Sequence, residues 1–157
     1  MTAISKAHEI TLAFATQLGR ITVSNGFQTD IGLRVFRGRR KVDITELPCV
    51  VLIEGDNEVI KRRGPGAPEV IIRQEYAIEA HLQVSDPDHP NDAGHAAKAD
   101  IKRGLFEPVW WRAAGLISAR NGLSFEGDVI LPREDGAAIV STVVGVSFEY
   151  HEDVSAP

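Results

Sequence analysis

The densest group of potential metal ligands lies between residues 86 and 95. Its carboxylate and imidazole side chains are ligands that divalent ions accept in proteins, and they belong to Asp86, Asp88, His89, Asp92 and His95. In this arrangement they would suit a small metal-dependent hydrolase. The same residues are also typical of turns, because Asp-Pro and His-Pro pairs favour them and Asp92 is well placed to cap a helix. The turn interpretation is favoured, so the sequence predicts no metal and no cofactor.

The chain contains no recognised catalytic signature. It lacks the nucleophile elbow, the zinc-protease helix motif and the phosphate-binding loop. The Gly64-Pro65-Gly66 stretch is too rich in proline to hold a phosphate. The single cysteine, Cys49, lies in an apolar run, where a thiol is usually a packing group rather than a nucleophile. We therefore expect a protein that is not an enzyme.

Two basic clusters are the strongest candidates for an interaction surface. Residues 121–157, in contrast, carry a single base, Arg133, and seven acids. One interpretation is that the basic clusters and the acidic region 121–157 are simply exposed to solvent. The other is that they contact an acidic partner, DNA phosphates or oppositely charged regions of further copies. The first cluster consists of Arg34, Arg37, Arg39, Arg40 and Lys41, and the second of Lys61, Arg62 and Arg63. All of these residues except Arg34 are candidate interaction residues.

The adjacent pair Trp110-Trp111 adds a further candidate. Neighbouring residues of a helix cannot both point to its interior, so one tryptophan should belong to the core. An exposed tryptophan is enriched at the energetic centres of interfaces. Trp111 is therefore a candidate anchor for a subunit contact.

Composition sets the broad class. The 157 residues are 43% hydrophobic and 25% charged, which is typical of one globular domain covering 1–157. The net charge of −5 argues against a protein that mainly coats nucleic acid. No apolar run approaches the roughly 20 residues that span a bilayer, and the start does not resemble a signal peptide. We expect a cytosolic origin without membrane contact.

The first half of the chain is predicted to form one helix followed by strands. Apolar residues at three- and four-residue steps predict an amphipathic helix over 3–20, capped by Thr2 or Ser5. Alternation from residue 31 predicts a strand. The apolar run 49–53 predicts a strand, 55–57 a turn, and 58–60 a return strand, followed by a loop at 61–68.

The second half begins with the clearest strand, over 69–84. At this length it would reach roughly 50 Å, so we expect a bend near Gln74 or a ribbon that projects from the body. A helix over 92–106, a break at Pro108, a short helix over 109–117 and strands at 124–131 and 138–150 follow. The predicted class is α+β, a mainly antiparallel twisted sheet of five to six strands in the order α-β-β-β-β-α-β-β, packed by the two main helices.

Several phrases in this arrangement carry a resemblance to a known family. The opening helix leads into NGFQTDIG (25–32) and VFRG (35–38), and then ELPCVVLIEG (46–55), EYAIEA (75–80) and an alanine-rich helix from 92 follow. Over roughly residues 4–106 this resembles the tail terminator, or tail completion, proteins of long-tailed bacteriophages, including the minor tail protein U group.

The resemblance implies a structural protein of a phage or prophage tail. Such proteins form a homo-oligomeric ring, commonly a hexamer, that caps the tail tube, stops its polymerisation and provides the head-joining surface. The implied partners are further copies, the major tail tube protein, a head-completion or connector protein and, in passing, DNA in the lumen. The implied location is the virion tail, assembled in the bacterial host cytoplasm. Another head–tail connector or neck protein is the alternative within this class.

Overall fold

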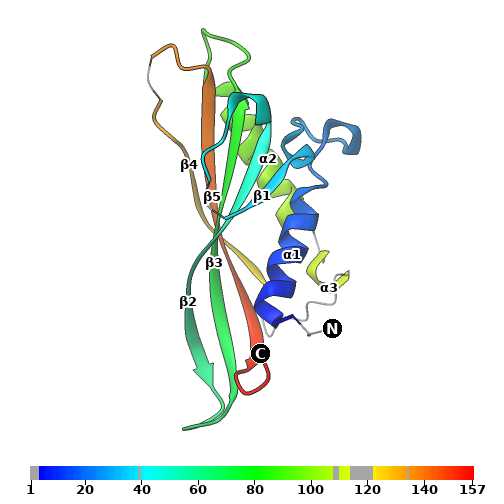
Figure 1. The fold of residues 1–157 in the computed structure, drawn as a ribbon, viewed down its shortest axis with the longest axis vertical. Coiled ribbons are helices and arrows are strands. Elements are labelled where there is room, and N and C mark those ends of the chain that lie inside the picture. The colour runs from blue at the N-terminus through cyan, green and yellow to red at the C-terminus, as the bar shows by residue number, and fades with distance from the viewer. Residues whose placement is uncertain (1–3, 39, 108–109, 114–121, 134) are drawn as a thin grey trace.

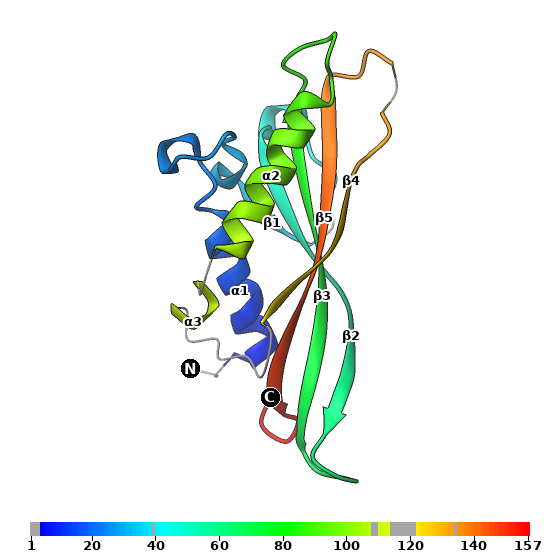
Figure 2. The same cartoon turned by 180° about the vertical axis from the view of Figure 1, so that it is seen from behind.

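One face of a five-stranded sheet is covered by two helices (Figures 1 and 2). The computed structural model describes residues 4–38, 40–107, 110–113, 122–133 and 135–157. The helices are α1 (Lys6–Leu18) and α2 (Asp92–Phe106), and α3 (Trp110–Ala113) is a single turn. The strands are β1 (Val35–Arg37), β2 (Cys49–Arg62), β3 (Glu69–Gln83), β4 (Leu123–Ile130) and β5 (Ile139–Asp153). The α+β class is confirmed.

The sheet is mixed, with the strand order β1-β2-β3-β5-β4. β1 runs parallel to β2, whereas the pairings β2–β3, β3–β5 and β4–β5 are antiparallel. The described residues thus contain three strands between α1 and α2, where the sequence had predicted four. β3 and β5 pair along their whole length, from Glu69 opposite Asp153 to Gln83 opposite Ile139. This long antiparallel pair forms the middle of the sheet.

Helix α1 supplies the centre of the core. The Ser5 side chain accepts a hydrogen bond from the His8 N–H, which confirms Ser5 as the cap and satisfies a donor of the first turn. The apolar positions of the helix face the sheet, and Phe14 is fully buried. Its ring lies 4.4 Å from that of Tyr76 and 5.1 Å from that of Trp110, measured between centroids. The core therefore joins α1, β3 and α3.

The strand predicted from residue 31 is wrong over its first half. Ile31–Leu33 is a 3-10 turn, and β1 begins only at Val35. The cause is a close approach of two backbone segments: the Gly32 N–H donates to the Ile21 carbonyl at 2.8 Å. A Cβ at position 32 would lie 2.5 Å from the Leu18 carbonyl oxygen. The contact with the end of α1 holds this segment away from the sheet.

The turn predicted at 55–57 is also wrong, because β2 continues through it to Arg62. A β-bulge lies between Glu54 and Asn57 instead. The Gln74 side-chain amide donates to the Gly55 carbonyl at 2.8 Å and to the Glu75 carbonyl at 2.9 Å, which satisfies backbone groups that the bulge leaves unpaired. The irregularity expected near Gln74 thus lies in the neighbouring strand.

The remaining elements match the sequence more closely. Helix α2 has the predicted bounds, and β4 and β5 lie within a few residues of the predicted strands. Of the short helix predicted over 109–117, the structure describes Trp110–Ala113. Residues 109 and 114–117, and Pro108 before them, lie outside the described residues. Lys61 and Arg62 end β2 rather than belonging to the loop that follows.

Candidate interaction surface

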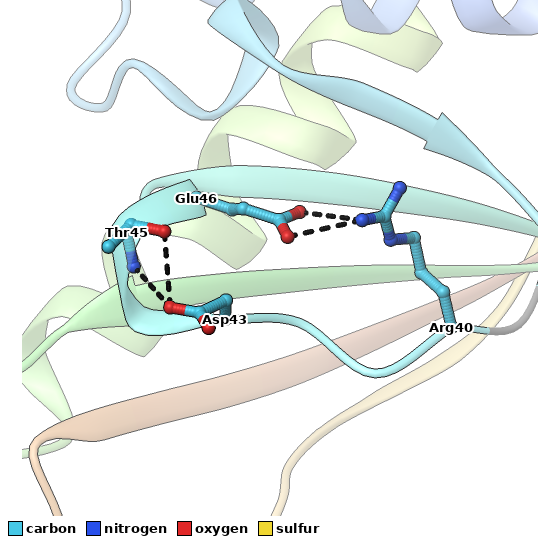
Figure 3. Close-up of polar contacts among 4 residues, drawn as sticks. All are labelled: Arg40, Asp43, Thr45 and Glu46. Carbon is cyan, nitrogen blue, oxygen red and sulfur yellow. Dashed lines mark hydrogen bonds and ion pairs between the residues drawn. The ribbon is translucent and has the colours of Figure 1, made fainter.

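The first basic cluster continues into a strap, defined here as residues 40–48, on the face of the sheet opposite the two helices (Figures 1 and 3). A single 3-10 turn, Ile44–Glu46, shapes it. The Asp43 carboxylate caps this turn and accepts from the Thr45 N–H at 3.0 Å and from the Thr45 hydroxyl at 3.1 Å. These two hydrogen bonds hold the pKa of Asp43 below its ordinary value. The strap therefore has a defined backbone path.

Arg40 anchors the strap. Its Nη2 atom donates to both carboxylate oxygens of Glu46, at 3.1 and 2.9 Å (Figure 3). Its guanidinium also lies 3.9 Å from the centre of the Phe36 ring, a cation–π contact. The sequence of the first basic cluster contains no acid, but in the folded chain Glu46 lies against it and pairs with Arg40. Arg40 is thus mainly a structural residue of the strap.

Other members of the first cluster face solvent. Arg34, Arg37 and Lys41 are exposed, and no described carboxylate forms an ion pair with any of them. Arg39 lies outside the described residues. The solvent-facing cations beside β1 are therefore free to meet a partner's carboxylates.

The second basic cluster lies at the far end of the β2–β3 ribbon (Figure 1). Arg63 pairs with Glu69 at 2.5 Å, while Lys61 and Arg62 are exposed. A groove of about 520 Å³ runs between these residues, Lys6 and the end of β5. In the strand register, Arg37 of β1 lies opposite Leu52 in the first part of β2, whereas Arg62 at the end of β2 lies opposite Val70 of β3. The fold therefore keeps the two clusters apart, and they form two surfaces rather than one.

The tryptophan pair divides as expected. Trp110 is buried, and its indole N–H donates to the Leu105 carbonyl at 2.7 Å. Trp111 is half-buried and contacts Trp110 edge-to-face, with the ring centroids 5.9 Å apart. Its indole also packs against the backbone of Gly122. The core role of one tryptophan is confirmed, and the subunit-contact role of Trp111 stays a prediction.

Residues 86–91 form a turn that leads into α2, and Asp92 and His95 lie in the first turn of that helix. The Asp86 carboxylate accepts from the Asp88 N–H and from His89 Nδ1, both at 2.9 Å. The hydrogen bonds from His89 and Asp88 hold the pKa of Asp86 below its ordinary value. Across the described ranges, no group of three or more His, Cys, Asp or Glu side chains is arranged to hold a metal ion.

Cys49 is fully buried at the start of β2. Burial, together with the nearby Glu46 carboxylate, raises the pKa of its thiol to about 11. The thiol is therefore protonated at neutral pH, and a protonated thiol is a poor nucleophile. This agrees with the packing role assigned from the sequence.

An ion cluster that sequence spacing did not reveal joins α2 to the edge strand β4. The Asp128 carboxylate accepts from Lys98 Nζ at 2.9 Å, and Lys102 binds its other oxygen. The hydrogen bonds from Lys102 and Lys98 lower the pKa of Asp128. Asp128 is thus held as a carboxylate between two cations, and the pair of lysines fixes β4 against the helix.

We expect Asp128→Asn to lower the free energy of unfolding by about 1 kcal/mol at pH 7, since Asp128 and Lys98 are mostly buried but Lys102 is exposed to solvent screening. A lowered folded-state pKa stabilises the fold above the unfolded carboxyl pKa of about 3.9, and this contribution is lost as the pH falls through the folded pKa. Urea unfolding at pH 7 and pH 3 checks this. The gap between variant and parent should shrink at the lower pH, and a constant gap would contradict the assignment.

No protein-family model matches the chain, and no curated protein matches it either. Over the part of the chain that the structure describes, no helix combines the length and apolar character needed to cross a membrane.

Proposed function

We propose that this protein is a non-enzymatic component of a phage or prophage tail, and that its copies form a hexameric ring on the end of the tail tube. The ring stops tube polymerisation and presents a surface to the head-completion or connector protein. The support is the resemblance of residues 4–106 to tail terminator proteins, together with the surfaces described above. In this proposal the protein functions in the virion tail after assembly in the host cytoplasm.

One structural observation carries the proposal furthest: the distal half of β2 adds no buried side chain to the core of a single copy, although Val70 and Ile72 of the neighbouring β3 are buried. Every residue of β2 from Glu54 to Arg62 is exposed, whereas the segment from Cys49 to Ile53 is buried. Ordering an exposed strand costs conformational entropy without a return from apolar burial. A long ribbon with a basic tip is therefore best explained by contacts with other chains.

The side chains that could act in catalysis have structural roles, which supports a non-enzymatic function. Asp86 is used in a turn, and the Cys49 thiol is buried and protonated. His81 Nδ1 is hydrogen-bonded to the Ser141 hydroxyl at 2.7 Å, across two neighbouring strands. Each of these groups contributes to local structure.

Sedimentation over a range of concentrations tests the proposal, with the protein measured alone, mixed with purified tail tubes and mixed with purified heads. We expect a ring-sized species that co-sediments with tubes. Co-sedimentation with heads but not with tubes would instead indicate a neck or connector protein. A protein that remains monomeric in both mixtures would refute the ring.

The basic tip gives a more local prediction. Arg62→Glu should weaken binding to tail tubes by about tenfold, a factor in the range expected when one interfacial charge is reversed. The fold should be unchanged, because Arg62 is exposed at the end of β2. Arg20→Glu reverses one exposed charge at the end of α1 and is the matched control. Equal tube binding by the two variants would show that the tip is only a solvated surface.

A further inference from the structure

The sheet ends in two outermost strands, β1 and β4, whose edges differ chemically from the exposed distal edge of β2. In the described residues, neither β1 nor β4 has a strand on its outer side. The distal edge of β2 is also open, but it carries two register irregularities and the charges of Glu54, Asp56, Glu58, Lys61 and Arg62. β4 carries one irregularity, between Phe125 and Gly127, and is regular from Gly127 to Ile130. Bulges and charges are devices that keep an edge from pairing with another strand. The distal β2 edge is therefore the best protected of the three.

Exposed apolar side chains mark both outer edges. Leu33, just before β1, is 64% exposed, and Phe125 and Val129 on β4 are each 48% exposed. The two β4 side chains lie on opposite faces of the sheet: Phe125 is opposite Val146 and contacts Phe106 of α2 edge-to-face at 6.4 Å, whereas Val129 is opposite Val143 on the other face. Apolar groups on an open edge strand favour strand addition, in which the backbone gives affinity and the side chains give specificity.

The exposed charges on the two edges differ in sign, apart from Lys98 and Lys102, which are paired with Asp128 of β4. Arg34 and Arg37 border Leu33 and are exposed without a described carboxylate partner. On β4, Glu126 is exposed and accepts from the Ser147 hydroxyl at 2.7 Å. Asp135, in the turn that follows β4, is exposed as well. Arranged face to face, the two edges would pair cations with carboxylates, which selects partner and register.

The strand directions also agree. β1 is parallel to β2, and each further step through β3 and β5 to β4 reverses direction. β1 and β4 of one chain therefore run in opposite directions. If the sheet of one copy continues into the next with the same orientation, β4 meets β1 as an antiparallel pair. The two edges lie on opposite sides of the sheet, so the contact is head-to-tail and can close into a ring.

We propose that the β4 edge of one copy pairs with the β1 edge of the next copy, with Val129 against Leu33 and Glu126 facing the Arg34–Arg37 side. This inference rests on the ring of the proposed function and names the surfaces that close it. The occupant of each edge is a second copy of this chain. Each contact uses one β1 edge and one β4 edge.

Lysine substitutions test the pairing. Leu33→Lys and Val129→Lys each place an edge-blocking charge on one of the two edges, and each should raise the concentration needed for half-assembly by at least about tenfold. Val154→Lys, at a residue that is 53% exposed in the C-terminal tail, is the matched control and should assemble as the parent does. Circular dichroism and thermal unfolding confirm that the variants are folded.

Mixing the two edge variants gives the sharper result. A Leu33→Lys chain keeps an intact β4 edge and a Val129→Lys chain keeps an intact β1 edge, so an equimolar mixture should form heterodimers and stop there. A second measurement uses Leu33→Cys with Val129→Cys in one chain, which should give disulfide-linked oligomers on oxidation, whereas Leu33→Cys alone should not. Edge variants that assemble like the parent, with no linked oligomers from the double cysteine chain, would overturn the pairing and leave the ring intact. A parent protein that never associates would overturn both.

Discussion

Replacing Phe14 by alanine should lower the free energy of unfolding by about 4 kcal/mol, the range measured for truncating a large buried aromatic residue. Phe14 has no exposed surface, and it contacts the rings of Tyr76, Trp110 and Phe148. Its removal would leave a cavity where α1 meets the sheet and α3. Urea unfolding monitored by tryptophan fluorescence measures the change, because Trp110 lies beside the site.

Leu12→Ala is the control for this prediction. Leu12 lies on the same helix but is 37% exposed, so its truncation should change the free energy of unfolding by less than about 1 kcal/mol. Both variants should keep the parental m-value, since the surface exposed on unfolding is nearly unchanged. Similar losses for the two variants would show that α1 does not pack on the sheet through the face described here.

Asp100→Ala should be nearly as damaging, at about 3 kcal/mol, because it removes an acceptor from several buried donors at once. Asp100 is only 1% exposed. Its carboxylate accepts from the N–H groups of Gln28 and Thr29 and from the Thr29 hydroxyl, at distances from 2.7 to 3.1 Å. These bonds tie the segment before β1 to helix α2.

Chemical unfolding separates this role from that of an ordinary surface acid. Asp92→Ala changes an exposed carboxylate in the first turn of the same helix and should cost less than about 1 kcal/mol. Thr29→Ala removes one of the donors and should give an intermediate loss. A value for Asp100→Ala no larger than that for Asp92→Ala would contradict the buried hydrogen-bond network.

Local periodicity predicted the elements whose apolar faces are set by spacing alone. The three- and four-residue steps of α1 and α2 and the alternation of β3 and β5 place their buried residues correctly. The errors occur where distant backbone or side chains override the pattern. Gly32 contacts the end of α1, and Gln74 supports a bulge in β2. Gln74 carried a signal, since it is a polar residue on the apolar parity of its strand and is buried.

The candidate surfaces were predicted less completely than the fold. Sequence clustering located Arg37, Lys41 and Arg62 on exposed surfaces, but it did not show that Glu46 folds back to bind Arg40. It also missed Asp100, whose only sequence signal is an acid beside the apolar stripe of α2. Pairings of this kind depend on how loops cross the sheet, and residue spacing does not encode that path.

The central claim is that copies of this chain end the tail tube as a ring. Electron microscopy of major tail protein polymerised with and without the chain tests it most directly. The account predicts tubes that stop growing when the protein is added, each with a ring density at one end and no further lengthening over time. Tubes that keep the same length distribution and bare ends at saturating protein would contradict it.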